Sequence, residues 1–232
     1  MSELYFNADS CDSLSIEIVS AEGTEVEVQY SIPNHGNPKA GQHYIAIWRT
    51  DDSGEIPWDQ KPIKTALVDK EQESSTAFLD DLELSNHHYV IGYSPVPEGK
   101  SQNFCASAFI SQLPLDQEEA DDGEGCCCIS LGLKKVSTES IDIEYKTLAQ
   151  FNPELNGNWI GVWDDAANFS SPPLRHSLVK GVACSGHLRF TDFPVVCGKK
   201  YRIGYFMSGY DEDKTKLTIT SLAAFVRFSA KG

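Results

Sequence analysis

The chain contains the same residue pattern twice, and this internal repeat restricts its fold more than any other feature. Val26-Glu-Val-Gln-Tyr30 in the first half matches Ile141-Asp-Ile-Glu-Tyr145 in the second half, at an offset of 115 positions. Tyr44-Ile-Ala-Ile-Trp48 matches Trp159-Ile-Gly-Val-Trp163 at the same offset, with no gap. Because both blocks recur in the same order, the sequence predicts a duplicated domain.

Three later blocks also recur in order, with small changes of offset. Phe78-Leu-Asp80 matches Phe190-Thr-Asp192, and Tyr89-Val-Ile-Gly-Tyr93 matches Tyr201-Arg-Ile-Gly-Tyr205, both at an offset of 112. Finally, Ser107-Ala-Phe-Ile110 matches Ala223-Ala-Phe-Val226 at an offset of 116. We therefore expect the second copy to have a shorter loop before the third block and a longer last hairpin.

The repeated blocks have the composition and spacing of β-strands. Residues 25–30 and 140–145 alternate apolar and polar side chains, which is typical of half-buried strands. Residues 44–48 and 159–163 are rich in aromatic and β-branched residues, and no stretch shows a sustained helical period. Seven short strands per copy, with a Trp on the third, predict an all-β protein of two tandem immunoglobulin-like antiparallel β-sandwiches. The expected strands are 14–19, 24–32, 43–49, 63–68, 76–82, 87–94 and 104–110, then 129–134, 139–147, 158–164, 174–180, 186–192, 200–207 and 217–228.

Charge and composition mark the domain boundaries. Six acidic residues lie between Asp116 and Gly125, so residues 113–128 are predicted to be an acidic linker between sandwiches at 1–112 and 129–232. Residues 1–112 hold 6 basic and 18 acidic residues, whereas residues 129–232 hold 13 basic and 10 acidic residues. This asymmetry favours self-association between the acidic and the basic half, although it is also what two diverged surfaces would show.

Net charge and cysteine usage restrict the partners and the compartment. A formal charge of −15 disfavours binding to nucleic acid or to an anionic membrane surface, and no apolar run is long enough to span a bilayer. The first residues show no secretory signal. Seven cysteines, three of them adjacent at Cys126, Cys127 and Cys128, do not form an extracellular disulfide pattern. We therefore expect a cytoplasmic protein. For the cysteine triplet, the sequence offers no physical explanation other than burial.

The second copy in particular resembles a known domain. Asn158-Trp-Ile-Gly-Val-Trp163, the pair Tyr201 and Tyr205, and the closing stretch Thr220–Phe228 resemble the SKICH-type sandwich. That domain occurs in autophagy receptors and phosphoinositide phosphatases. The resemblance covers about three strands of each copy, and residues 44–48 replace the motif in the first copy. It implies an immunoglobulin-like β-sandwich that serves as a non-catalytic interaction module, without carrying over any functional residue.

The chain lacks the common catalytic and cofactor-binding motifs. No phosphate loop, dinucleotide-binding glycine motif or G-x-S-x-G motif is present. Cys184, His187 and Cys197 lack the paired spacing of structural zinc sites, and a Cys184–His187 dyad has no evident orienting acid. We therefore predict no catalytic residue, no metal and no cofactor.

The candidate binding residues follow the third strand of each copy. Trp58 and Asp59 lie in a turn-rich loop at residues 50–62. The position that matches Trp58 in the second copy is a proline, so a core common to both copies does not require a tryptophan there. Asp164, Asp165 and Phe169 lie in the corresponding loop at residues 164–174. Exposed loop aromatics anchor protein interfaces or stack on sugar rings. Packing of Trp58 over the end of the sandwich is the structural alternative.

The function that these features favour is non-enzymatic binding of a macromolecular partner, most simply a protein, through the end loops. The first alternative is a cytosolic carbohydrate-binding lectin, because carboxylates stand next to the loop aromatics in both copies. The second alternative is an enzyme with an unfamiliar site between the two sandwiches.

Overall fold

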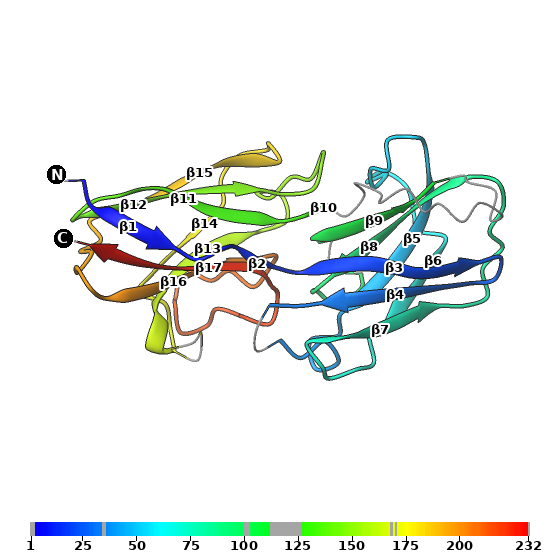
Figure 1. Cartoon of the computed structure of the whole chain (residues 1–232), viewed down its shortest axis with the longest axis horizontal. Coiled ribbons are helices and arrows are strands. Elements are labelled where there is room, and N and C mark those ends of the chain that lie inside the picture. The colour runs from blue at the N-terminus through cyan, green and yellow to red at the C-terminus, as the bar shows by residue number, and fades with distance from the viewer. Residues whose placement is uncertain are drawn as a thin grey trace. The chain divides into compact units, whose positions relative to one another are not determined.

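A computed structural model describes residues 3–33, 36–99, 103–111, 127–167, 169 and 171–231. Within these ranges the regular elements are β-strands, apart from one short 3-10 helix, η1 (Asp165–Ala167) (Figure 1). All strand pairs are antiparallel. The predicted all-β class and antiparallel pairing are therefore confirmed.

The chain divides into two compact units, each of which contains a piece from the other half of the sequence. The N-unit comprises Leu14–Cys128 with Leu148–Gln150, and the C-unit comprises Met1–Ser13, Ile129–Thr147 and Phe151–Gly232. The N-terminal residues, predicted to belong to the first sandwich, thus form part of the C-unit. Cys127 and Cys128, predicted to end the linker, form a strand of the N-unit. The rest of the predicted linker lies outside the described residues.

The N-unit contains a five-stranded and a three-stranded sheet (Figure 1). The strand order of the larger sheet is β10-β9-β8-β5-β6, and that of the smaller sheet is β3-β4-β7. The bounds are β3 (Ser15–Glu22), β4 (Glu25–Ser31), β5 (Tyr44–Thr50), β6 (Lys64–Leu67), β7 (Ser74–Leu79), β8 (His88–Ser94), β9 (Ala106–Ile110) and β10 (Cys127–Cys128).

The C-unit contains a six-stranded and a three-stranded sheet. The larger has the order β1-β17-β16-β13-β14, with β2 also paired to β17, and the smaller has the order β11-β12-β15. The bounds are β1 (Tyr5–Ala8), β2 (Asp12–Ser13), β11 (Ser130–Val136), β12 (Ser140–Lys146), β13 (Trp159–Asp164), β14 (Arg175–Leu178), β15 (Ser185–Thr191), β16 (Lys200–Phe206) and β17 (Leu222–Lys231).

The hydrophobic pattern explains which strands form the centre of each unit. In β4 the apolar side chains alternate inward, so that Val26, Val28 and Tyr30 are buried between polar neighbours that are exposed or half-buried. In β5 and β13 five consecutive residues are buried, because each strand has a partner on both sides and is covered on both faces. The aromatic side chains of Tyr44, Trp48, Trp159 and Trp163 are therefore part of the core.

The strand register corrects one of the matched sequence blocks. Val26 is paired with Leu79 in the N-unit, whereas Ile141 is paired with Phe190 in the C-unit. Leu79 therefore occupies the place of Phe190, one residue later than the sequence comparison predicted. Phe78, the residue matched from sequence, is 42% exposed, whereas Leu79 and Phe190 are buried. A shift of one residue moves a side chain to the other face of a strand, so the burial decides the register.

Candidate functional site

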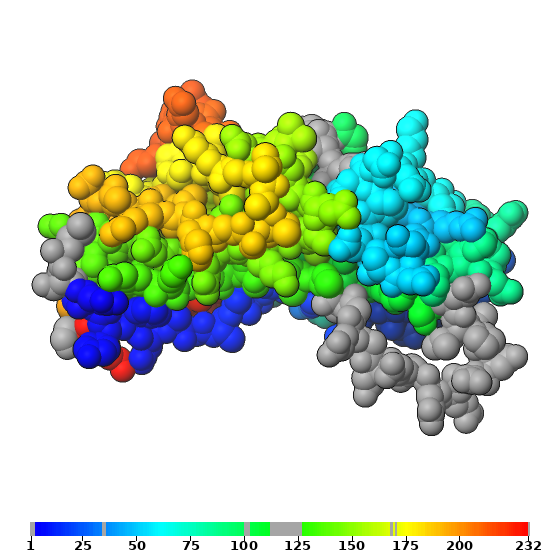
Figure 2. Space-filling model, turned by 90° about the horizontal axis from the view of Figure 1, so that it is seen from above, coloured from blue at the N-terminus to red at the C-terminus, as the bar shows by residue number. Residues whose placement is uncertain are grey.

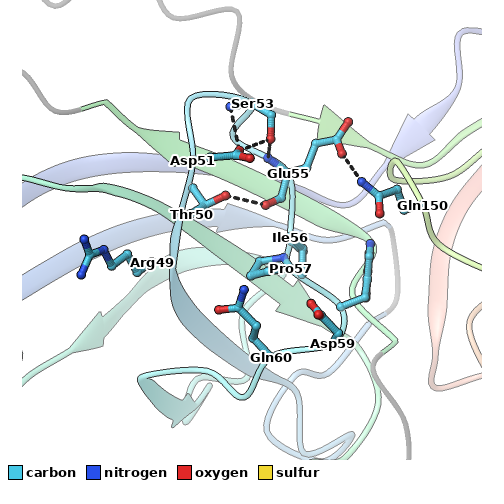
Figure 3. Close-up of a pocket in the computed structure, with 11 residues that line it drawn as sticks. Arg49, Thr50, Asp51, Ser53, Glu55, Ile56, Pro57, Asp59, Gln60 and Gln150 are labelled. Atoms are coloured by element: carbon cyan, nitrogen blue, oxygen red, sulfur yellow. Dashed lines mark hydrogen bonds between the residues drawn. The ribbon is translucent and has the colours of Figure 1, made fainter.

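The loop between β5 and β6 forms one wall of an open cavity of about 700 Å³ in the N-unit (Figure 3). This stretch, light blue to cyan in Figure 2, forms part of the surface of its unit. The cavity is lined mainly by polar side chains: Arg49, Thr50, Asp51, Ser53, Glu55, Ile56, Pro57, Trp58, Asp59, Gln60 and Gln150. Its volume lies within the range of ligand pockets in proteins, although its lining is more polar than is usual for them.

Short-range hydrogen bonds hold this loop in one conformation. The Thr50 hydroxyl donates to the Glu55 carbonyl at 2.9 Å, and the Ser53 N–H donates to the Asp51 carboxylate at 3.0 Å. The Glu55 N–H donates to the Ser53 hydroxyl at 3.2 Å. The Ser53 hydroxyl also donates to the Asp51 carboxylate. This side-chain hydrogen bond, and to a smaller extent the bond from the Ser53 N–H, lowers the pKa of the Asp51 carboxyl below its usual value. The loop is therefore organised before any partner binds.

The tip of the loop is also packed against the neighbouring strands. Gly54 has a φ of +66°, and a Cβ atom there would approach the Phe109 ring to 2.9 Å. The Phe109 ring is in turn stacked on His88, whose Nε2 lies 3.0 Å from the Asp52 carboxylate. Glycine is required here both for its backbone conformation and for the close approach of Phe109.

Trp58 is half-buried and forms part of the wall, so the packing alternative describes it better than an exposed anchor. Its indole N–H donates to the Ala149 carbonyl at 2.8 Å, and its ring centroid lies 6.3 Å from that of Phe104. Beside it, the Gln150 side-chain amide donates to the Glu55 carboxylate at 2.6 Å (Figure 3). Segment Leu148–Gln150 therefore completes the cavity.

The cavity carries more negative than positive charge. Asp51, Glu55 and Asp59 line it together with the single cation Arg49, which points to the side opposite Asp59 in Figure 3. Asp59 is exposed and has no hydrogen-bond or ion-pair partner among the described residues. An approaching cation would therefore meet an unpaired carboxylate.

The distribution of charge between the units differs from the one that the sequence halves suggested. The N-unit holds 6 basic and 21 acidic residues, so that it carries the whole net charge of −15. The C-unit holds 13 of each, because the N-terminal residues bring Glu3, Asp9 and Asp12 into it. Since the C-unit is neutral, the electrostatic reason for an association between an acidic and a basic half is lost.

In the C-unit, the structure gives Asp164 and Asp165 partners within the fold. The Asp164 carboxylate lies 2.7 Å from Lys199 Nζ, and this hydrogen bond lowers the pKa of Asp164. Asp165 lies 3.0 Å from the nearly buried guanidinium of Arg202 and 3.3 Å from Arg227. Asp165 thus fixes η1 against β16 and β17, and Asp164 joins the end of β13 to the residue before β16. Neither carboxylate is a free ligand.

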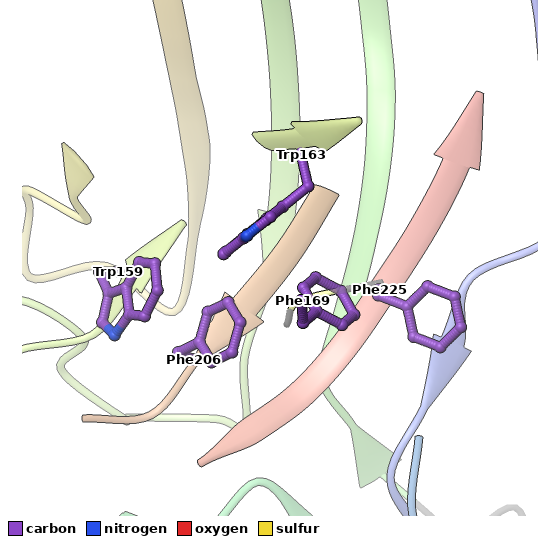
Figure 4. Close-up of a cluster of buried hydrophobic side chains, with 5 residues drawn as sticks. All are labelled: Trp159, Trp163, Phe169, Phe206 and Phe225. Carbon is purple, nitrogen blue, oxygen red and sulfur yellow. The ribbon is translucent and has the colours of Figure 1, made fainter. Parts of the chain in front are cut away.

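Phe169, predicted as the second anchor, is a core residue. It is 5% exposed and packs with Trp163, Phe206 and Phe225, with ring centroids 4.8 to 5.9 Å apart (Figure 4). The Arg202 guanidinium lies 5.1 Å from its ring centroid. The expectation of an exposed Phe169 is therefore corrected, because the loop folds inward over the larger sheet.

The sequence-predicted residues thus separate into two groups. Trp58 and Asp59 line the cavity of the N-unit, whereas Asp164, Asp165 and Phe169 stabilise the loop of the C-unit. The sequence analysis missed Arg49 and Gln150. No sequence signal marks Gln150, because it lies more than 90 positions from Trp58 and reaches the cavity only through folding.

The remaining thiols and imidazoles do not form a metal site among the described residues. No three His, Cys, Asp or Glu side chains gather closely enough there to hold a metal ion. The described cysteines are free thiols, and burial raises the pKa of Cys105 well above its usual value. Cys126 lies outside the described residues.

No protein-family model and no curated protein matches the chain. The resemblance to the SKICH-type domain therefore stays a prediction from sequence. Among the described residues, no helix is long and apolar enough to cross a membrane.

Two solved structures show a distant likeness to the chain. The chain is similar to a DUF3823 family protein from Bacteroides uniformis, with 8% identity and a TM-score of 0.26 over 82% of this chain and 88% of that chain. It is also similar to human GIVD cytosolic phospholipase A2, with 8% identity and a TM-score of 0.20 over 98% of this chain. The latter match covers 33% of that enzyme's chain. At TM-scores this low, the likeness carries no information about function.

Proposed function

We propose that this protein is a non-enzymatic binding protein that engages a protein partner through the cavity beside the β5–β6 loop. The preferred ligand is an extended segment with a Lys or Arg side chain that enters the cavity. The observation that carries this proposal is the Asp59 carboxylate, which has no hydrogen-bond or ion-pair partner in the described part of the chain, in a prearranged, acidic cavity of about 700 Å³.

The geometry supports a protein ligand for two reasons. The loop is held by its own hydrogen bonds, so little conformational entropy is lost on binding. The half-buried Trp58 ring lies beside Asp59 and offers an apolar surface for the methylene groups of a Lys or Arg side chain. The net charge of the N-unit would add long-range attraction for a basic segment.

The test is a titration of the full chain with short peptides of matched length that are rich in Lys and Arg, neutral, or acidic. We expect binding of the basic peptide alone, and a loss of about tenfold or more in affinity for Asp59→Lys. Glu83→Lys is the control, since it makes the same change of charge at an exposed site outside the cavity. Equal loss in both variants, or no peptide binding at all, would contradict the proposal.

A lectin function is the second candidate, because an aromatic ring and the polar groups of Asp59 and Gln60 line one cavity. That combination also suits a sugar ring and its hydroxyl groups. Binding of a neutral oligosaccharide that is lost in Asp59→Ala, together with no binding of basic peptides, would favour this candidate over the first.

We further infer that the two units are duplicated immunoglobulin-like sandwiches. In the two smaller sheets, the pair β4–β7 occupies the position of the pair β12–β15. In the two larger sheets, the pair β5–β8 occupies the position of the pair β13–β16. The irregularity between Ile18 and Ser20 in β3 recurs between Leu133 and Lys135 in β11, 115 positions later. Correspondence at this level supports the repeat that the sequence indicates.

We also propose that the protein works in a reducing compartment such as the cytoplasm. Six cysteines of the described part are free thiols, and Cys127 and Cys197 are exposed. Exposed thiols persist where cellular reductants maintain them.

A further inference from the structure

Each unit takes the edge of its larger sheet from the opposite part of the chain. β2 and β3 are separated only by Leu14, yet β2 pairs with β17 of the C-unit and β3 pairs with β4 of the N-unit. β10 and β11 are separated only by Ile129, yet β10 pairs with β9 of the N-unit and β11 pairs with β12 of the C-unit. The exchange is therefore reciprocal.

The two crossing points occupy equivalent positions of the repeat. Asp12 and Cys127 are 115 positions apart, which is also the separation of the crossing residues Leu14 and Ile129. Both crossing residues are completely buried. The chain therefore passes from one unit to the other at the same position in both copies.

Further contacts strengthen each exchange within its own unit. On the C-unit, β1 pairs with the last residues of β17, and the Asp9 N–H donates to the Arg227 carbonyl at 2.9 Å. The Leu131 N–H donates to the Cys11 thiol sulfur at 3.3 Å. On the N-unit, Leu148 is buried and Ala149 accepts the hydrogen bond of Trp58.

We infer that the edge of β17 is a docking surface for the two short strands of residues 3–13 of the same chain, and that this pairing holds the first half of the chain on the C-unit. The edge of β9 is the reciprocal docking surface for β10. As a consequence, the two halves of the chain stay together without a covalent link between residues 113 and 126. This follows from pairing inside each unit, and it needs no contact between the units.

The physical reason is that an uncovered sheet edge is unfavourable. Without residues 3–13, the ten-residue strand β17 would present unpaired N–H and C=O groups along one side. A fragment from the first half would therefore be held by the C-unit, and a fragment from the second half would be held by the N-unit. The inference does not rest on the proposed function of the cavity.

The test uses the full chain with a sequence-specific protease site placed between residues 116 and 125. After complete cleavage, we expect both fragments to elute together in size-exclusion chromatography as one species with the mass of the uncut protein. They should separate only in denaturant. Separate elution of the fragments under native conditions would overturn the inference.

Variants show whether the exchanged segments cause the association. Asp9→Pro removes the N–H that donates to Arg227, and Trp58→Phe removes the donor to Ala149. In the cut protein, each should weaken fragment association by about fivefold to tenfold, which corresponds to one hydrogen bond. Val182→Ser is the control, because Val182 is 74% exposed and lies outside the exchanged segments. Association that none of these variants changes would overturn the inference.

A measurement on the uncut chain gives an independent result. Asp9→Pro should increase amide hydrogen exchange in β17 of the C-unit and leave β4 and β5 of the N-unit unchanged. Phe6→Ala, a milder change in the same segment, should give the same pattern at a smaller amplitude. Unchanged exchange in β17 in both variants would contradict the assigned docking surface.

Discussion

At the residue scale, similar sequence positions take different structural roles. Trp58 follows β5 and Phe169 follows β13, but Trp58 lines an open cavity and Phe169 is buried among aromatic rings. Ion pairs decide the difference. Arg202 of β16 and Arg227 of β17 pair with Asp165 and hold the C-unit loop on the sheet, and the Arg202 guanidinium covers the Phe169 ring.

Replacement of Phe169 tests its role in the core. Phe169→Ala should lower the free energy of unfolding by about 3–5 kcal/mol, because it removes a large buried ring and its contact with Arg202. Urea unfolding followed by tryptophan fluorescence measures the change. Val182→Ala, at an exposed site, should stay within about 0.5 kcal/mol of the wild type. A similarly small effect for Phe169→Ala would show that the ring is not part of the core.

The pH dependence of Asp51 tests the order of the cavity loop. Since hydrogen bonds from Ser53 lower the pKa of this carboxyl in the folded state, the ionised form stabilises the loop above the unfolded pKa of about 3.9. That stabilisation is lost as the pH falls through the lower, folded pKa. A carboxyl-carbon NMR titration should show this lowered pKa, and Ser53→Ala should raise it towards its usual value. An unchanged pKa in Ser53→Ala would contradict the assignment.

At the scale of the elements, the loop between β5 and β6 forms a wall of the cavity, and the central strand β5 supports this loop. The first five residues of β5 are buried, and the strand continues directly into the cavity loop, so the loop begins from a fixed point. The Ile63 N–H donates to the Ile47 carbonyl at 2.8 Å and returns the loop to the sheet. A rigid strand on each side explains how a loop with little buried surface keeps one conformation.

Gly54 tests whether the conformation of this loop matters for binding. Gly54→Ala and Gly99→Ala each place a side chain at positive φ, at a cost of about 1–2 kcal/mol. Only at Gly54 would the new Cβ atom meet a neighbour, Phe109. We therefore expect both variants to lower stability in urea unfolding, but only Gly54→Ala to weaken binding of the basic peptide. Equal binding by both variants would argue against a prearranged loop.

At the scale of the whole molecule, the two units differ in charge although their sheets are similar. The N-unit carries the entire net charge of −15, whereas the C-unit is neutral. A function based on attraction of a basic partner therefore belongs to the N-unit. The C-unit instead provides the sheet that holds the first residues of the chain.

Salt dependence tests the contribution of this charge. The affinity of the full chain for the basic peptide should fall by at least about tenfold when the salt concentration rises from about 0.05 to 0.5 M, because exposed charges are screened. Isothermal titration calorimetry at several salt concentrations measures it. An affinity independent of salt would show that apolar contacts, and not the carboxylates, govern binding.

Much of the fold follows from local patterns in the sequence. Alternation of apolar residues identified β4 and β12, and aromatic and β-branched runs identified β5 and β13, because the period of a strand is visible in neighbouring residues. The same patterns placed Trp58 and Asp59 in the loop that lines the cavity. Burial of Phe169 was not visible, since the Arg202–Asp165 pair that brings the loop inward joins residues 37 positions apart.

The tertiary structure was needed for every feature that depends on distant pairing. The one-residue register of Leu79 depends on its partner Val26, and the position of Gln150 depends on the folding of Leu148–Gln150 onto the N-unit. The assignment of β1 and β2 to the C-unit depends on β17, more than 200 positions later. Local propensity shows that a segment is a strand, but hydrogen bonding across the sheet decides which strand it joins.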